Sequence, residues 1–332
     1  MKVRGVTLGL ALVAAGAQAA RAQGGSVDTQ CRAGTPSERI TQDACQKALD
    51  LFTYLAPQLA GGLAGGNALS GEHSVVGGPG HTSIGLRLNA VHARIPQIDA
   101  LTPAIAGAVA SNYRVSEHYI PVPTIDAAVG VFRGVEIGGA TALGVDALLN
   151  LSVLPSVKTS DVEVSLPDGP LKLGFGARIS LVSESVVTPG ISLTYLRRDL
   201  PRIAVTGSPS SDEIQVNDFQ VKTSAWRGVI GKNLGPIAIT AGFGQDTYTT
   251  SALATVLVSR GGITTKAGPI GATQKLTRDN AFASVALNLP VVSIVGEGGR
   301  ASGGSLATYN TFAGTRADDQ LTYASLGMRF RF

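Results

Sequence analysis

The sequence has little charge and few aromatic side chains. Asp, Glu, Lys and Arg make up 15% of its 332 residues and Phe, Trp and Tyr only 5%, whereas soluble globular chains carry about 25% charged residues. Disorder is excluded because disordered chains are also poor in apolar residues, and this chain is 44% apolar. Beyond the extreme N-terminus it has no run of about 18 apolar residues, which excludes helices that span a membrane. Two classes remain: a soluble α/β protein of unusually low charge and a transmembrane β-barrel.

The motifs of common catalytic and cofactor sites are also missing. The four histidines form neither an H-E-x-x-H motif nor a pair four residues apart, and the chain has no G-x-S-x-G sequence and no Walker loop. Residues 78–83, Gly-Pro-Gly-His-Thr-Ser, distantly resemble the histidine segment of outer-membrane phospholipases, but no matching serine or calcium-binding segment accompanies them. A lipid hydrolase is therefore only a third hypothesis, and we expect no enzymatic activity, no cofactor and no bound metal.

Residues 1–22 have the pattern of a secretory signal peptide. Lys2 and Arg4 precede an apolar stretch over 5–15, and small-x-small cleavage sites follow at 17–19 and 20–22. Cleavage after Ala22 is favoured over a membrane anchor, because about 15 apolar residues are short for a span. Cleavage removes three basic residues and no acidic one, so that 27 basic against 23 acidic residues become 24 against 23. Nucleic acid is therefore not an expected partner.

The two cysteines of the chain, Cys31 and Cys45, directly follow the signal segment. In an exported protein such a pair is expected to form one disulfide that closes a short loop. Free or otherwise paired thiols are the alternative. A metal site would need further ligands, and the nearest histidine is His73.

Residues 23–80 are predicted to form a plug or a periplasmic cap with one helix over about 36–60. Thr35 can cap the helix, Pro36 suits its first position, and Glu38 can complete a capping box. Gly61-Gly62 is the predicted stop, and a Gly-rich linker follows. Apolar side chains recur at helical spacing at Ile40, Ala44, Ala48, Leu51, Leu55 and Leu59. An amphipathic helix on the membrane surface is less favoured, because the polar face has little Lys or Arg.

From about residue 82 onward, apolar and polar residues alternate with a period of two. In Leu171–Leu181 the odd positions are apolar and the even ones small or polar, and similar runs start at Ile84, Val145 and Ile237. Runs of about 10 to 14 residues exceed the five or six of a globular strand and are long enough for the roughly 9 to 11 that cross a membrane. We predict an all-β fold over 81–332, a transmembrane antiparallel up-and-down barrel whose second face lines the lumen.

The predicted strands are joined by alternating short and long connections, as expected for a barrel. The pattern gives ten strands. A further hairpin hidden in the long connections 95–121 and 249–277 would raise the number to twelve or at most fourteen. The aromatic girdle of such barrels is thin here: Trp226 is the single tryptophan, and the aromatic residues near predicted strand ends are Tyr195, Tyr248, Phe282 and Tyr323.

The C-terminal segment 321–332 resembles the closing strand of bacterial outer-membrane barrels. The assembly signal of those strands is polar-x-Gly-x-x-apolar-x-apolar with a terminal aromatic, and its positions hold Ser325, Gly327, Phe330 and Phe332. The resemblance implies an outer-membrane location and recognition by the barrel-assembly machinery. The alternative is an ordinary amphipathic edge strand that ends in Phe.

Two longer segments, 51–99 and 120–202, resemble a poorly characterised family of bacterial outer-membrane barrels with a signal peptide and a short helical segment. The motifs behind the resemblance are Tyr54-Leu55-Ala56-Pro57, Pro121-Val122-Pro123-Thr124, Gly174-Phe175-Gly176-Ala177-Arg178, Ser183-Glu184-Ser185 and Thr188-Pro189-Gly190-Ile191-Ser192. These motifs are structural and imply no chemistry. A more distant, purely architectural likeness is to the long-chain fatty-acid transporters, which also have an N-terminal plug.

Eight charged residues are predicted to point into the lumen: Arg87, Asp146, Lys172, Arg178, Glu184, Arg198, Arg329 and Arg331. In a small barrel such groups usually pair and fill the interior, which we favour over a selective pore lining. The first functional hypothesis is a narrow outer-membrane channel or passive transporter for small or hydrophobic solutes. The alternative is a non-transporting structural or adhesion barrel that acts through its external loops. Expected partners are outer-membrane lipid, the barrel-assembly machinery and such a solute.

Overall fold

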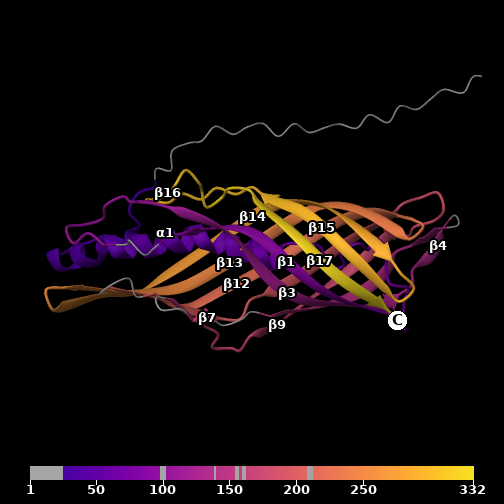
Figure 1. Cartoon of the computed structure of the whole chain (residues 1–332), viewed down its shortest axis with the longest axis horizontal. Coiled ribbons are helices and arrows are strands. Elements are labelled where there is room, and N and C mark those ends of the chain that lie inside the picture. Colours follow the sequence, from indigo (N-terminus) through magenta and orange to yellow (C-terminus); the bar gives the residue numbers. More distant parts are fainter. Residues whose placement is uncertain (1–24, 98–101, 138–139, 154–156, 159–161, 208–211) are drawn as a thin grey trace, which may run out of the picture.

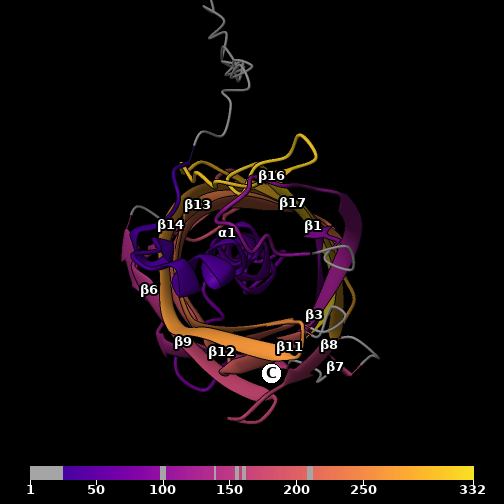
Figure 2. The same ribbon diagram turned by 90° about the vertical axis from the view of Figure 1, so that its left-hand side faces the viewer.

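The computed structural model describes residues 25–97, 102–137, 140–153, 157–158, 162–207 and 212–332. The predicted signal peptide, residues 1–22, lies outside these residues. The chain forms an elongated β-barrel that contains one long helix (Figures 1 and 2).

Ten strands of the described residues form a closed antiparallel ring, which confirms the predicted up-and-down barrel. Neighbours in the ring follow the order of the chain, and β17 pairs with β1 to close it. The ring strands are β1 (Thr82–Pro96), β3 (Val115–Phe132), β6 (Gly144–Val153), β9 (Leu171–Val182), β10 (Gly190–Asp199), β12 (Glu213–Leu234), β13 (Ile237–Arg260), β14 (Ile263–Asn288), β15 (Val292–Ser302) and β17 (Leu321–Arg331).

Short strands lie at the two ends of the ring. β11 (Ile203–Gly207), β8 (Val162–Ser165) and β7 (Val157–Lys158) extend the main sheet from β12. β4 (Val135–Ile137) pairs with β5 (Ala140–Ala142), and β2 (Asn112–Tyr113) pairs in parallel with β16 (Thr311–Phe312).

The two faces of the barrel wall have the polarity of a membrane barrel. In β9, the outward side chains of Leu173 and Phe175 are 70% and 62% exposed, whereas the inward Arg178 and Ser180 are almost fully buried. A sheet with one face in water buries its apolar face and exposes its polar one. Here the apolar face is exposed and the polar face is buried, as expected for a barrel whose outer surface faces lipid and whose interior is polar and filled.

The short connections lie at the end of the barrel that holds the C-terminus, and the long ones lie at the opposite end (Figure 1). At the short-connection end, Phe332 and Thr82 exchange two backbone hydrogen bonds, and Gly235-Pro236 joins β12 to β13. The predicted alternation is present except between β13 and β14, which are joined by a two-residue turn. The other connections still identify both ends of the barrel.

Neither long connection adds a strand to the ring. Segment 249–277 is the part of β13 and β14 at the long-connection end, where the two strands stay paired up to a turn at Gly261-Gly262. In 95–121, the described residues contain only β2 besides the ends of β1 and β3. The additional length of β13 and β14 extends one side of the wall beyond the rest of the ring. The number of ring strands stays at ten.

The long helix of the described residues, α1 (Pro36–Ala64), lies inside the ring, which is the position of a plug (Figure 2). It begins as predicted, with Thr35 as cap and Glu38 completing the capping box. Hydrogen bonds from backbone N–H groups of Gly34 and Thr35 lower the pKa of the Glu38 carboxyl. None of the helical segments in the described part of the chain combines the length and hydropathy that a bilayer crossing requires.

The predicted helix stop at Gly61-Gly62 is wrong, because α1 continues to Ala64. Both glycines face the wall at close range: a Cβ on Gly61 would lie 2.6 Å from Cδ1 of Leu321, and one on Gly62 would lie 3.4 Å from Cγ2 of Val122. Glycine is an unfavourable helix residue, but here it lets the helix approach the wall. The tertiary contact outweighs the local preference.

Pro57 lies inside α1 without ending it. Proline has no N–H, so the carbonyl of Thr53, four residues earlier, loses its donor within the helix. Gln274 of β14 donates from Nε2 to this carbonyl over 3.0 Å. The wall thus replaces the missing hydrogen bond, and the helix stays continuous across the proline.

Three of the aromatic residues expected near strand ends do not belong to a girdle. Tyr248, Phe282 and Tyr323 are buried in the lumen, because their positions have inward parity. The outward aromatic residues on the ring strands include Tyr119, Phe132, Phe175, Tyr195, Trp226 and Phe243, each at least 39% exposed. The girdle is therefore thin, and the aromatic residues are divided between the inner and the outer face of the wall.

Cys31 and Cys45 form the predicted disulfide. The bond joins η1 (Thr29–Cys31) to α1, and both residues are buried. It closes the chain ahead of the helix into a loop at the long-connection end.

Candidate functional site

Three arginines of the barrel wall hold the C-terminal end of α1. The last carbonyls of a helix lack partners within it and carry the negative end of its dipole, and the last turn of α1 has no basic residue of its own. The donor and acceptor pairs are Arg198 Nη1 to the Leu63 carbonyl (2.8 Å), Arg227 Nη2 to that of Ala64 (3.3 Å) and Arg87 Nη1 to that of Gly65 (3.2 Å). We call these three residues the arginine clamp.

Two residues of the arginine clamp also pair with carboxylates of the wall. Nε of Arg87 lies 3.0 Å from Asp126, and Nη1 of Arg227 lies 2.5 Å from Asp246. All four side chains are buried. Removal of one partner from a buried pair leaves an uncompensated charge, so this arrangement strongly favours a single position of the helix end.

A second cluster surrounds Glu72, on the segment between α1 and β1. Its carboxylate lies 3.0 Å from Arg178 Nη1, 3.1 Å from Arg329 Nε and 3.2 Å from Arg331 Nε. Arg178 also pairs with Asp146 over 2.6 Å, and Arg329 donates to the carbonyl of Ser70. These contacts attach the segment to two strands of the wall, β9 and β17.

His73 holds the same segment at the short-connection end. Its Nε2 lies 2.8 Å from Glu184 Oε2, and Glu184 Oε1 accepts from the backbone N–H of Asn233 over 2.7 Å. The ring lies between Gly190 and Gly231, where a Cβ on either residue would collide with it. A cavity of about 300 Å³ opens beside this contact, lined in part by the side chains of His73, Ser74, Arg133, Thr141, Glu184 and Arg331.

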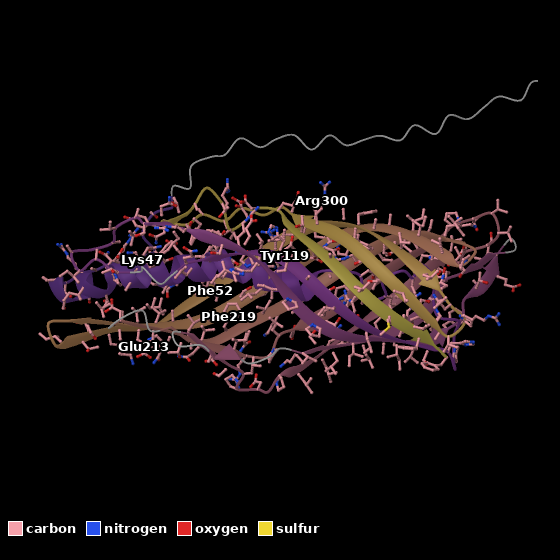
Figure 3. All side chains as sticks on the ribbon, in the orientation of Figure 1. Lys47, Phe52, Tyr119, Glu213, Phe219 and Arg300 are labelled. Atoms are coloured by element: carbon pink, nitrogen blue, oxygen red, sulfur yellow. A yellow bond between two sulfur atoms is a disulfide. The ribbon has the colours of Figure 1, made fainter. Side chains whose placement is uncertain are left out.

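Long connections cover the outer half of the helix. Asp43 accepts backbone hydrogen bonds from Ala104 and Val109, at 2.7 and 2.8 Å. Asp50 accepts from the backbone and side-chain amides of Asn310. The rings of Phe52 and Phe219, on α1 and β12, meet edge to face at 5.9 Å between centroids (Figure 3). The lumen is therefore occupied from the arginine clamp to its outer mouth.

The structure brings most of the predicted lumen residues into contact with the plug. Arg87, Asp146, Arg178, Arg198 and Arg329 are buried inside the ring. Glu184 and Arg331 lie at the rim of the short-connection end, where they pair with His73 and Glu72. Lys172 is half-buried on β9, and among the described residues it has no ion-pair partner.

Several residues of the site were missed by the sequence reasoning. Asp126, Arg227, Asp246 and Glu297 lie on inward positions of the strands, and extending the period-two pattern over these segments could have found them. Glu72 had no such signal, because it lies in the glycine-rich segment that reads as a linker. Its role depends on the fold around it.

The predicted assembly-signal residues divide between the two faces and the end of β17. Ser325 is buried, and Gly327 lies opposite Arg87, where a Cβ would be 2.9 Å from the Leu86 carbonyl. Phe330 is half-buried, and Phe332 is 67% exposed at the short-connection end. The terminal aromatic is therefore accessible beside the seam between β17 and β1.

In the described part of the chain, no three His, Cys, Asp or Glu side chains are grouped so that they could hold a metal ion. The contacts above can position a helix and fill a lumen. They do not assemble a nucleophile, a base and an oxyanion site.

Comparisons with known proteins assign no family to the chain. No protein-family model and no curated protein sequence matches it. The translocator domain of the autotransporter NalP from Neisseria meningitidis is 11% identical over 89% of this chain and 96% of that one, with a TM-score of 0.41. Ail, the attachment invasion locus protein of Yersinia pestis, is 10% identical over 76% and 99%, with a TM-score of 0.25.

A FadL homologue of Pseudomonas aeruginosa is 7% identical over 82% of this chain and 97% of that one, with a TM-score of 0.24. Because these sequence identities and TM-scores are low, the class of protein is assigned from the chain's own architecture. With a closed ring of strands, an apolar outer face and a polar interior, the chain is an outer-membrane-type β-barrel protein.

Proposed function

We propose that this protein is a closed outer-membrane barrel that holds its N-terminal segment and its long connections at the cell surface and transports no solute. The observation that carries the proposal is the course of the chain through the lumen. Gln30, ahead of the helix, donates to the Gly271 carbonyl in the outer part of β14, whereas the segment after the helix reaches β1 at the opposite end (Figure 1). Of the two main hypotheses from the sequence, this is the non-transporting one.

The direction of display follows from the two ends of the barrel. Outer-membrane barrels have short periplasmic turns and longer extracellular loops. The end with Phe332 and the short connections would then face the periplasm, and the long-connection end the outside. Residues 25–35, the disulfide and the start of α1 belong to the external end.

The occupied lumen favours display over transport. A channel needs an aqueous path, but here the helix, the arginine clamp and the long connections occupy it. A hydrogen bond to a charged group contributes about 1.5–3 kcal/mol. Loss of the three bonds of the arginine clamp would therefore oppose withdrawal of the helix by several kcal/mol, in addition to the lost apolar packing.

Cysteine labelling tests the direction of display. We expect the thiol of Ser26→Cys to react with a membrane-impermeant maleimide on intact cells. Ser26 is exposed, and its neighbour Gly25 lies against the backbone of Thr308 and Tyr309 in the long connection between β15 and β17. The matched variant Val186→Cys places the thiol in the turn after β9, where Val186 is 97% exposed. This cysteine should react only after the outer membrane is permeabilised. Labelling in the opposite pattern would reject the proposed orientation.

A gated transporter is the second candidate. The cavity of about 300 Å³ at the short-connection end and the non-helical course of residues 66–81 favour it, because a solute could enter there if the helix moved. The conductance experiment in the Discussion separates it from a permanently closed barrel.

We propose no enzymatic role. His81, the residue behind the lipid-hydrolase hypothesis, is exposed. Its backbone bonds to Gly78 and Gly130 are the hydrogen bonds that it makes within the described residues, so its imidazole has no catalytic partner there.

Recognition by the barrel-assembly machinery is part of the same proposal. Deletion of Phe332 is expected to reduce the fraction of folded, heat-modifiable barrel in the outer membrane severalfold, because it removes the terminal aromatic and its two backbone bonds to Thr82. Phe332→Tyr keeps both and should assemble normally. Normal assembly of the deletion variant would mean that the terminal aromatic of β17 is not an assembly signal.

A further inference from the structure

A patch of basic and hydroxyl side chains lies on the outer face of β12, β13 and β14. The strand register places its members in two adjacent rows: Lys222, Thr249 and Lys275 in one, and Ser224, Thr247 and Thr277 in the next. We call these six residues the lysine–hydroxyl patch. All six are exposed or half-buried, while the alternate residues Thr223, Thr250 and Leu276 are buried inside the ring. The patch therefore points away from the lumen.

The patch lies just beyond the apolar belt, toward the long-connection end. The next row toward the short-connection end contains Trp226, which is 39% exposed and contacts Phe243 edge to face at 6.2 Å between ring centroids. The outward residues of the same strands beyond them include Ile230 and Ile239, both exposed. Tryptophan marks the membrane–water interface, so the two rows above it lie at the level of lipid head groups.

The two lysines of the patch are free to bind a ligand. Neither has an ion-pair partner among the described residues, and within β12, β13 and β14 no acidic residue belongs to the two rows. On β10 the register continues the rows with Asp199 opposite Lys222 and Arg197 opposite Ser224. The nearest acids in the register already have partners: Asp199 lies 3.7 Å from Arg197, and Asp279 accepts from Gln245 over 3.3 Å.

The spacing of the patch suits one phosphate group with sugar hydroxyls beside it. Lys222 and Lys275 lie on either side of Thr249, two strand spacings or about 10 Å apart. Flexible four-carbon stems allow both ammonium groups to converge on one anion, and lysine binds phosphate as a point charge. The four hydroxyls are both donors and acceptors, as a sugar head group requires.

We propose that the lysine–hydroxyl patch binds the phosphorylated sugar head group of a glycolipid in the outer leaflet. The lysines contact the phosphate, the hydroxyls contact the sugar, and the acyl chains lie along the apolar belt below Trp226. The proposal requires the barrel orientation given above but not a closed lumen. A lipid would bind more tightly than free phosphate, because its acyl chains also contact the apolar belt.

Native mass spectrometry of the detergent-purified protein tests the proposal with a diglucosamine lipid that carries two phosphates. The double variant K222Q/K275Q should bind about tenfold more weakly, since it loses two charge-assisted contacts. The dephosphorylated lipid should bind the native protein with a similar loss. The control K266Q removes another exposed lysine of β14, near the hairpin tip, and should bind like the native protein.

Three results would overturn the proposal: unchanged affinity of K222Q/K275Q, equal affinity for the phosphorylated and dephosphorylated lipids, or displacement of the lipid by an equal concentration of inorganic phosphate. The variants replace exposed side chains, and their heat-modifiable migration shows whether they are folded. Labelling at Ser26 and Val186 reports the orientation separately, so a failure of head-group binding is distinguishable from a failure of the display proposal.

Discussion

Replacement of Glu72 by Gln is expected to lower the free energy of unfolding by about 3–5 kcal/mol, the usual cost of removing one partner from a buried ion pair. The Glu72 carboxylate is shared by Arg178, Arg329 and Arg331, and the first two guanidinium groups are buried. Gln keeps the shape of the side chain but leaves Arg329 and Arg331 without their counterion, while Arg178 keeps only its pair with Asp146. Urea unfolding of the protein in lipid vesicles measures the difference.

Glu136→Gln is the matched control for this experiment. Glu136 is exposed on β4 and makes no ion pair within the described residues, so its replacement should change the free energy of unfolding by less than about 0.5 kcal/mol. A similarly small effect of Glu72→Gln would mean that the segment after α1 is not held by the arginines around it.

Removal of residues 25–65 is expected to convert a silent protein into a conducting one. The native barrel should show no stepwise conductance in a planar bilayer, because α1 occupies its lumen. The deletion removes the helix together with the three carbonyls bound by the arginine clamp, and it leaves Glu72 and its arginines in place. The polar inner face of the wall would then line a water-filled path.

A shorter deletion controls for loss of the N-terminal segment alone. Removal of residues 25–35, combined with Cys45→Ser to avoid a free thiol, leaves α1 in the lumen and should remain silent. Steady conductance of the native protein would reject the closed barrel and favour the gated transporter. Silence of the folded 25–65 deletion variant would show that the helix is not what closes the lumen.

The barrel itself could be predicted from the sequence because its signal is local and repeated. In β9, every second residue is apolar and faces lipid, so a period of two identifies strand and face together. The helix start was equally local, since Thr35, Pro36 and Glu38 meet within one turn. The disulfide also needed only two cysteines in an exported chain.

Predictions that depended on distant neighbours were wrong or incomplete. The helix passes Gly61-Gly62 because Leu321 and Val122 approach it there, and it passes Pro57 because Gln274 replaces a hydrogen-bond donor. Segment 249–277 has the turn and polar residues of a loop, yet its strands stay paired and cover the helix with Ala254 and Val256. In each case, the residue that meets the helix is at least 60 residues away in the chain.

The sequence by itself determined the kind of protein: an all-β barrel with apolar side chains outside, polar ones inside, and a helix and a disulfide ahead of it. Alternation, capping and cysteine pairing act over short distances, so these features can be read from neighbouring residues. Only the tertiary structure decided that the helix occupies the lumen, that its N-terminus lies at the long-connection end, and that three strands supply the arginine clamp. Those decisions depend on which charges meet when the ring closes, and closure brings together residues that no local pattern relates.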